Sequence, residues 1–283
     1  MTPLIVEDTI RRALIEDCPT RDITSETTIP EDMRSRAILR SREDGVLSGI
    51  DVAREAFLLT DPSIRLTPAI RDGAGIHPRD VIATIEGPAR GILRAERVAL
   101  NFLQRMSGIA TLTRRFVDAA NGAPGSHARI ADTRKTMPGL RPFDRYAVRC
   151  GGGHNHRYGL SDAVLVKDNH LAAMREAGLD LSEALRHIRS RIGHTTHIEV
   201  EIDGLDQLPM ALEGGADTVM FDNFGIEDIR RGVDMVAGRA IVEASGTMTL
   251  DRVAAVASCG VDVISVGALT HSVSAIDVGL DWR

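Results

Sequence analysis

The sequence predicts an α/β protein, in which a C-terminal α/β barrel of parallel strands follows an N-terminal α+β open-sandwich domain. Three observations support this fold class. After residue 126, short apolar strands alternate with helical stretches, as in βαβ units. Before residue 94, several short strands are separated by turns, and few helices interrupt them. The apolar content is 43% but aromatic residues make up only 3%, which is typical of aliphatic cores around buried parallel strands.

The predicted domain limits follow from these changes in pattern. We expect residues 1–115 to form the N-terminal domain and residues 116–270 the barrel, with the tail 271–283 packing back on the first domain. The segment 121–126, NGAPGS, is rich in turn-forming residues and reads as the linker. A chain of 283 residues is long enough for this arrangement.

The N-terminal domain is predicted to begin with an amphipathic helix over residues 6–17, where Ile10 and Leu14 share a face opposite charged residues. A second helix, over residues 52–59, is expected to end before Asp61 and Pro62. Turn residues separate the predicted strands, which are residues 35–43, 65–70, 81–85 and 91–93.

A longer helix is predicted over residues 94–119, because Val98, Phe102 and Met106 belong to an apolar stripe at helical spacing. Arg105 and Arg114 lie on this helix. Spacing alone favours a solvated helix face for both arginines.

The barrel strands are predicted at residues 129–131, 163–166, 197–202, 218–221, 240–242 and 263–266. In parallel α/β barrels, functional groups gather at the carboxyl ends of the strands. Here the residues at those ends are Asp132, Arg134, Lys135, Lys167, Glu201, Asp222, Glu243, Ser245, Gly246 and Gly267. Cations and carboxylates therefore converge on one rim, which suits a phosphorylated substrate together with a divalent metal such as Mg²⁺.

Composition excludes several classes of partner. The formal net charge is −6 and basic residues gather only locally, so we expect no nucleic-acid surface. No uncharged apolar segment is long enough to cross a bilayer, and Glu7 and Asp8 lie where a secretory signal would need an apolar core. The three cysteines, Cys18, Cys150 and Cys259, are widely spaced and do not suggest a disulfide framework. We therefore expect a cytoplasmic protein with no membrane partner.

The densest group of cations lies in residues 132–170, around the glycine triplet 151–153. Arg134 precedes the triplet, and His156 and Arg157 follow it. Glycines let the backbone approach a ligand closely, and guanidinium groups bind carboxylates with two parallel hydrogen bonds. The run therefore predicts a polyanion site in which Arg134, His156 and Arg157 clamp carboxylates.

Carboxylates on the predicted strands allow two interpretations. Glu199 and Glu201 alternate with aliphatic residues, so both are expected on one side of their strand, the inner side of a barrel. They could bind a metal, or they could be internal carboxylates neutralised by Lys167 or an arginine. Asp222 ends its strand and could serve as a helix cap instead.

Two strand-to-helix junctions resemble anion sites. Ser245, Gly246 and Thr247 follow one strand, and Gly267 and Ala268 follow the next. Backbone N–H groups at such junctions favour a phosphate. Glycine there can also serve only the turn, so the prediction of one shared phosphate site rests on finding two junctions on consecutive strands.

The histidines and Cys150 also have alternative readings. His154 and His156 would share a face on a strand and could bind zinc, but no third ligand lies at zinc spacing nearby, which favours a loop that binds an anion or the backbone. Cys150 could be a nucleophile, yet no catalytic signature surrounds it, which favours a packed thiol.

Taken together, the ordered motifs resemble those of quinolinate phosphoribosyltransferases, also called nicotinate-nucleotide pyrophosphorylases (carboxylating). The motifs are DTRKTMPG (132–139), YAVRCGGGHNHR (146–157), VKDNH (166–170), EVE (199–201), FDNF (221–224), EASG (243–246) and VGALTHS (266–272). The resemblance covers nearly the whole chain. It implies transfer of phosphoribosyl from phosphoribosyl pyrophosphate to quinolinate, with decarboxylation to nicotinate mononucleotide in de novo NAD biosynthesis.

The resemblance also implies roles for individual residues. It implies catalytic roles for Lys135, Lys167, Glu201 and Asp222, with Glu201 and Asp222 binding the ribose hydroxyls and Mg²⁺. The substrate-binding set it implies is Arg105, Arg134, Lys135, His156, Arg157, Lys167, Glu201, Asp222, Glu243, Ser245, Gly246, Thr247 and Gly267. In the family, Arg105 would reach a neighbouring subunit's site, so the resemblance implies a homodimer or higher homo-oligomer with shared active sites.

Two other functions stay open from sequence. A paralogous phosphoribosyltransferase of the molybdate-operon type would keep the phosphate loops but use another acceptor. Its acceptor would not need Arg105, Arg134, His156 and Arg157 together. A non-catalytic binder of sugar phosphates would bind these ligands without turnover, and would not need the complete set of carboxylates and cations.

Overall fold

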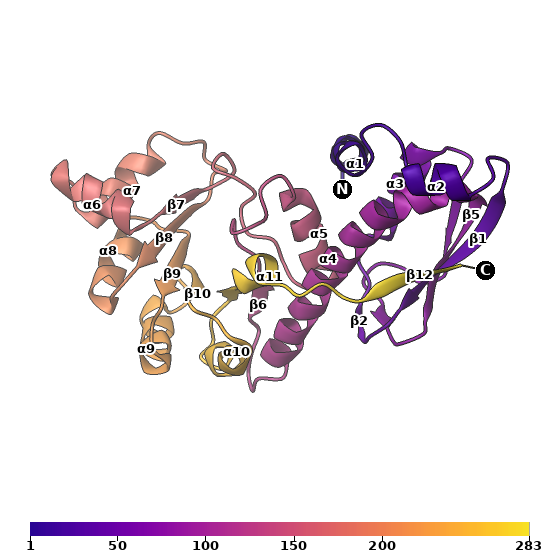
Figure 1. The fold of residues 1–283 in the computed structure, drawn as a ribbon. Coiled ribbons are helices and arrows are strands. Elements are labelled where there is room, and N and C mark those ends of the chain that lie inside the picture. The colour runs from indigo at the N-terminus through magenta and orange to yellow at the C-terminus, as the bar shows by residue number, and fades with distance from the viewer. Residues whose placement is uncertain (283) are drawn as a thin grey trace. The chain divides into compact units, whose positions relative to one another are not determined.

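In the computed structural model, which describes residues 1–282, the chain forms two compact units (Figure 1). The first contains residues 1–114, residues 136–152 and the segment from Thr270 onward. The second contains residues 115–135 and 153–269. The domain limits at residues 115 and 270 stay a prediction. That prediction did not include the packing of residues 136–152 with the first unit.

The first unit is built on an antiparallel four-stranded sheet in the order β12-β1-β5-β3. The tail enters this sheet, since Leu280 of β12 lies opposite Leu39 of β1. The strands and helices that belong mainly to this unit are α1 (Pro3–Asp17), α2 (Ile23–Thr28), β1 (Arg34–Ser41), β2 (Gly45–Val46), α3 (Ile50–Thr60), β3 (Arg65–Pro68), β4 (Gly75–Ile76), β5 (Val81–Pro88), α4 (Ala89–Asn121), α5 (Arg141–Cys150) and β12 (Val278–Trp282).

One predicted strand in this unit is wrong. Residues 91–93 are the first turn of α4, which begins at Ala89 rather than at residue 94. The buried positions Ile92, Ala95 and Ala99 recur three to four residues apart, so the apolar stripe extends back to the start of the helix. Gly91 suits this close packing, because a Cβ atom there would lie 3.1 Å from the Ile64 side chain.

The second unit contains six parallel strands in the order β6-β11-β10-β9-β8-β7, with helices α7 to α10 along one face (Figure 1). Its elements are β6 (Arg129–Ala131), β7 (Val164–Val166), α6 (Asp168–Glu176), α7 (Leu181–Arg189), β8 (Ile198–Ile202), η1 (Leu205–Gln207), α8 (Leu208–Glu213), β9 (Thr218–Asp222), α9 (Ile226–Val236), β10 (Ile241–Ser245), α10 (Leu250–Ala257), β11 (Val263–Ser265) and α11 (Ala268–His271).

These elements confirm the predicted fold class, a parallel α/β unit beside a small antiparallel unit. All six predicted barrel strands form, and β10 extends further than predicted, to Ser245. Within residues 1–282, β6 and β7 form no ladder with each other, so the sheet keeps two edges instead of closing into a hydrogen-bonded ring. Among these residues, no helix combines the length and the apolar character needed to cross a membrane.

Candidate active site

One face of the parallel sheet carries the charged residues that the sequence singled out. Glu201 on β8 and Glu243 on β10 both lie level with Met220 on the strand between them. Residues at the same level of a sheet point to the same side, and so do residues two apart on a strand. This shared face therefore carries Lys167, Glu199, Glu201, Asp222, Glu243 and Ser245.

Lys167 and Glu201 form the closest charged contact on this face. Nζ of Lys167 donates to Oε2 of Glu201 over 2.5 Å. The glutamate side chain is 10% exposed and the lysine 45% exposed, so the ammonium group stays accessible while it neutralises a buried carboxylate. Lys135 and Lys167 are the only two lysines in the chain, in which lysine and arginine together number 34.

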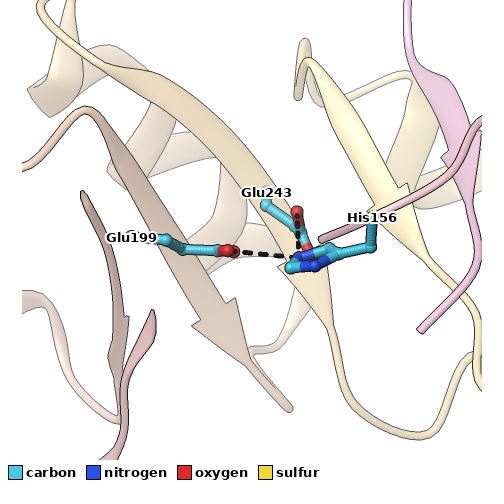
Figure 2. A group of neighbouring side chains, drawn as sticks. All are labelled: His156, Glu199 and Glu243. Carbon is cyan, nitrogen blue, oxygen red and sulfur yellow. Dashed lines mark ion pairs between the residues drawn. The ribbon is translucent and has the colours of Figure 1, made fainter. Parts of the chain in front are cut away.

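His156 lies between two further carboxylates of the same face (Figure 2). Its Nε2 is 3.1 Å from Oε2 of Glu199 and 3.5 Å from Oε2 of Glu243. Both glutamates are buried, and the Oε1 atom of each accepts no hydrogen bond within residues 1–282. The three side chains are therefore a buried cluster with more acceptor atoms than donors.

This cluster holds one proton more at neutral pH than the isolated groups would. Burial opposes charge on His156, but Glu199 and Glu243 outweigh it and raise the pKa of the imidazole to about 10. Burial also raises the pKa of Glu199. The backbone N–H of Arg157 donates to Nδ1 of His156 over 2.9 Å, so Nδ1 acts as an acceptor. The N–H on Nε2 then faces the two glutamates.

The same contact argues against a metal ion at this cluster. One nitrogen of His156 and one oxygen each of Glu199 and Glu243 lie within 4.8 Å of one another, a spacing that a metal could bridge. A metal on Nε2 would need that atom's lone pair, whereas an accepting Nδ1 places the N–H on Nε2. Both ring nitrogens of His156 thus contact protein groups. Binding of a substrate carboxylate by His156 stays a prediction, and it would require one of these contacts to break.

Asp132 positions the loop that contains His156. It is fully buried, its Oδ1 accepts from the His156 backbone N–H over 2.8 Å, and its Oδ2 accepts from Asn155 over 2.6 Å. Arg157 follows, and burial together with the neighbouring Arg134 guanidinium lowers its pKa. Two arginines that repel each other favour an anion between or beside them, which agrees with the predicted carboxylate clamp.

The predicted phosphate loops lie on adjacent strands, since β10 pairs with β11. Gly246 has φ +109°, and a Cβ atom there would lie 2.2 Å from Oδ1 of Asn223, so only glycine fits. Asn223 Oδ1 accepts the backbone N–H of Thr247 over 2.9 Å, and α10 begins only at Leu250. The loop is therefore held from the neighbouring strand, and the Thr247 amide is already used.

Glu201 and Asp222 are the predicted Mg²⁺ ligands, and their chemistry fits that ion. Both offer carboxylate oxygens, which Mg²⁺ prefers, and Mg²⁺ commonly binds through one or two carboxylates plus substrate phosphates. Asp222 is half-buried, accepts from the side chain of Asn223 over 2.9 Å, and borders a pocket of about 420 Å³ with Asp203 and Asp228. Because Glu201 already contacts Lys167, Glu201 and Asp222 suit a metal ion that is also held by the phosphates of the substrate.

In the first unit, Arg105 is not the solvated residue that spacing favoured. Its Nε and Nη2 donate to the two carboxylate oxygens of Asp144 over 3.1 and 2.9 Å, and Nη2 also donates to the Thr270 carbonyl over 3.1 Å. Arg114 on the same helix instead donates to the Gly151 carbonyl over 3.0 Å. Burial raises the pKa of the Cys150 thiol, as expected for a packed side chain.

The sequence therefore identified most of the residues that the parallel sheet brings together. It did not identify Asp144 or the role of Asp132 as an anchor. A signal existed for Asp132, a carboxylate directly after a predicted strand. For Asp144 none existed, because its partner Arg105 lies 39 residues away.

Two models of known protein families match this chain. Residues 109–281 match the family model for the quinolinate phosphoribosyl transferase C-terminal domain, and residues 22–107 match the model for the N-terminal domain. The chain belongs to the quinolinate phosphoribosyltransferase family. The two matches follow each other directly and cover most of the chain, in agreement with the motif resemblance.

Members of this family from several organisms are similar along their whole length. A probable nicotinate-nucleotide pyrophosphorylase [carboxylating] of Bacillus subtilis is 39% identical over 281 residues, which cover 99% of this chain and 94% of the relative. The nicotinate-nucleotide pyrophosphorylase [carboxylating] of Mycobacterium leprae is 42% identical over 283 residues, covering 97% and 96%. The crystal structure of NadC from Streptococcus pyogenes is 35% identical, with a TM-score of 0.94 over 100% of this chain and 99% of that one.

Proposed function

We propose that this protein transfers the phosphoribosyl group of phosphoribosyl pyrophosphate to quinolinate and releases pyrophosphate and CO₂, giving nicotinate mononucleotide for NAD synthesis. Membership of the family supports this activity, as do the names of the relatives. The observation that carries it is the single sheet face on which Lys167, Glu201 and Asp222 meet the loop after β10. That face combines the positive and negative groups that an ionised sugar phosphate requires.

Transfer begins when the ring nitrogen of quinolinate attacks C1 of the ribose and the bond to pyrophosphate breaks. Positive charge develops on the ribose in the transition state, and the carboxylates of Glu201 and Asp222 would stabilise it. The ammonium groups of Lys135 and Lys167 would stabilise the departing pyrophosphate. Glu201 and Asp222 would also hold Mg²⁺, which neutralises phosphate charge when bound. Attack by a ring nitrogen needs no general base.

The acceptor half of the proposal uses the remaining cations. Quinolinate carries two carboxylates, and Arg134, His156, Arg157 and Arg105 are the groups proposed to bind them. Loss of CO₂ leaves an electron pair at C2 of the pyridinium ring, which the ring cation and nearby cationic side chains stabilise. The ring then takes up a proton at C2.

The 5-phosphate of the ribose is assigned to the loops after β10 and β11. Gly246 and Gly267 lie in these loops, Ser245 and Thr247 flank Gly246, and Glu243 lies just before them in β10. The left-handed backbone at Gly246 and its contact with Asn223 support a loop of fixed shape.

The experiment is an assay of nicotinate mononucleotide formation by the purified protein with phosphoribosyl pyrophosphate and Mg²⁺, using quinolinate or nicotinate as acceptor. We expect product from quinolinate alone, and loss of product when EDTA removes the metal. No product from either acceptor, while phosphoribosyl pyrophosphate still binds, would reject quinolinate and favour the paralogous transferase. Binding of all substrates without turnover would favour the non-catalytic binder.

The assembly and location belong to the same proposal. A homodimer with shared active sites would let Arg105 act in a neighbouring subunit, so subunits that are separated by dilution should lose activity. A cytoplasmic location agrees with the free thiols of Cys18, Cys150 and Cys259.

A further inference from the structure

Arg105 is held by a buried acid that no motif pointed to. Asp144 lies in the first turns of α5, and its side chain is 0% exposed, whereas that of Arg105 is 23% exposed. The two side chains meet through a pair of parallel hydrogen bonds, from Nε to Oδ1 and from Nη2 to Oδ2. This two-point geometry fixes the plane of the guanidinium group as well as its position.

The contacts leave one side of the guanidinium group unused. Nη2 spends its second N–H on the Thr270 carbonyl, so three of the five donors are engaged. Nη1 makes no hydrogen bond to any residue from 1 to 282, and it carries the remaining two N–H groups. A partly exposed arginine held in this way presents Nη1 in a fixed position, where either of its N–H groups can donate to an oxygen of a carboxylate.

Asp144 is itself fixed by its surroundings. Its Oδ2 also accepts the backbone N–H of Met137 over 3.2 Å, which ties the carboxylate to the loop before α5. Beside it, the ring of Phe143 packs on Phe102 of α4 with centroids 5.2 Å apart. The helix that carries Asp144 is thus packed against the helix that carries Arg105, and the clamp does not depend on a flexible surface loop.

We propose that Asp144 is a positioning residue for Arg105, holding the guanidinium group so that Nη1 is ready to bind a carboxylate of the acceptor. An unclamped arginine would lose side-chain freedom each time it bound a ligand, and that loss weakens binding. Because Asp144 already restricts the Arg105 side chain in the folded protein, little further side-chain freedom is lost when a ligand binds. The inference rests on the proposed function, because the acceptor must carry carboxylates.

The test combines two measurements on the full chain and on the variants D144N, D144E, R105A and D144N/R105A. Asn keeps the shape of Asp144 and can accept from Met137, but its amide cannot accept two N–H groups from Arg105. We expect D144N to raise KM for quinolinate about tenfold, with kcat and KM for phosphoribosyl pyrophosphate within about twofold. We expect D144E to restore part of the affinity, and D144N to add nothing to the KM of R105A. The matched control is R97A, which changes an exposed arginine of the same helix and should leave KM equal to that of the wild type.

The second measurement does not depend on activity. Thermal unfolding of the wild type, D144N, R105A and the double variant tests whether the two residues act as one unit, in which case the double variant unfolds at a temperature close to that of the single variants. Additive shifts would overturn the clamp. An unchanged KM in D144N, with an active wild type, would overturn its role in acceptor binding. A wild type without turnover would reject the proposed function and the acceptor role together, while the unfolding data would still decide whether the clamp exists.

Discussion

The antiparallel and parallel sheets of this molecule bury very different side chains. In the antiparallel sheet, the inward positions of β1 and β5 are aliphatic, and Leu39 and Ile85 are 1% and 0% exposed. In the parallel sheet, Glu199, Glu201 and Glu243 are 5%, 9% and 4% exposed. Buried aliphatic side chains stabilise a fold, whereas buried carboxylates oppose folding unless partners offset their desolvation.

The two sheets therefore differ in what their buried side chains contribute. Three buried glutamates share two cationic partners, Lys167 and His156, and two of their oxygens accept no hydrogen bond within the described chain. A sheet selected only for stability would replace such groups with aliphatic residues. The parallel sheet keeps them, in agreement with the proposed active site, while the antiparallel sheet supplies an ordinary core.

The largest effect is expected on the face of the parallel sheet that we propose to be catalytic. Lys167→Ala should lower the rate of nicotinate mononucleotide formation by roughly 1000-fold, because it removes a cation at the developing pyrophosphate charge. Lys167→Arg should fail too, since a planar guanidinium cannot replace the compact ammonium at 2.5 Å from Glu201. Lys135→Ala should behave alike. Near-normal turnover in any of these variants would remove the catalytic assignment from that lysine.

An aliphatic position of the antiparallel sheet should show the opposite response. Ile85→Ala should lower the free energy of unfolding by about 2–5 kcal/mol, because it leaves a cavity at a fully buried site. The folded fraction should keep kcat within about twofold. Denaturant titration and turnover of the same preparation provide the check. A large loss of kcat in fully folded protein would contradict this difference between the two sheets.

The buried cluster predicts a pH dependence of stability that the antiparallel sheet lacks. His156 titrates near its ordinary value of 6.5 when unfolded and at about 10 when folded, so its stabilising contribution is complete below pH 6.5 and is lost as the pH rises through 10. The free energy of unfolding should fall over this interval by roughly 1.4 kcal/mol for each pKa unit that is realised. The measurement is urea unfolding of the wild type and of His156→Asn between pH 6 and 10. If the free energy of unfolding changed equally with pH in both proteins, the cluster would not cause the pH dependence.

The smallest effect is expected on the exposed face of the antiparallel sheet. Arg36 lies opposite Glu86, with Nε 3.4 Å from Oε1 and both side chains more than half exposed. Arg36→Ala should change the free energy of unfolding by less than about 1 kcal/mol and leave turnover unaltered. A larger loss of stability would show that exposed charges matter more in this sheet than its aliphatic core suggests.

The structural information that can be inferred from the sequence is local. Short apolar runs between helical stretches predicted the strands of the parallel sheet, an apolar stripe at helical spacing predicted most of α4, and the ordered motifs around Lys167 and Gly246 identified the family. Strand ends also pointed to Lys167, Glu201 and Asp222, which share one face of the sheet, because the carboxyl ends of parallel strands meet at one edge. The strand predicted at residues 91–93 failed, since three residues that begin with a glycine carry too little periodicity to distinguish a strand from a helix turn.

The pairing of the charged groups depends on how distant elements pack together. Residues 199 and 243 are far apart in the chain, and the register of β8, β9 and β10 brings them to His156. In the same way, the packing of α5 on α4 turned Arg105 from a residue on a helix face into the partner of Asp144. A local sequence pattern indicates which residues of a single helix or strand are buried. The partner of a buried charge depends on contacts between distant elements, and only the folded chain brings those together.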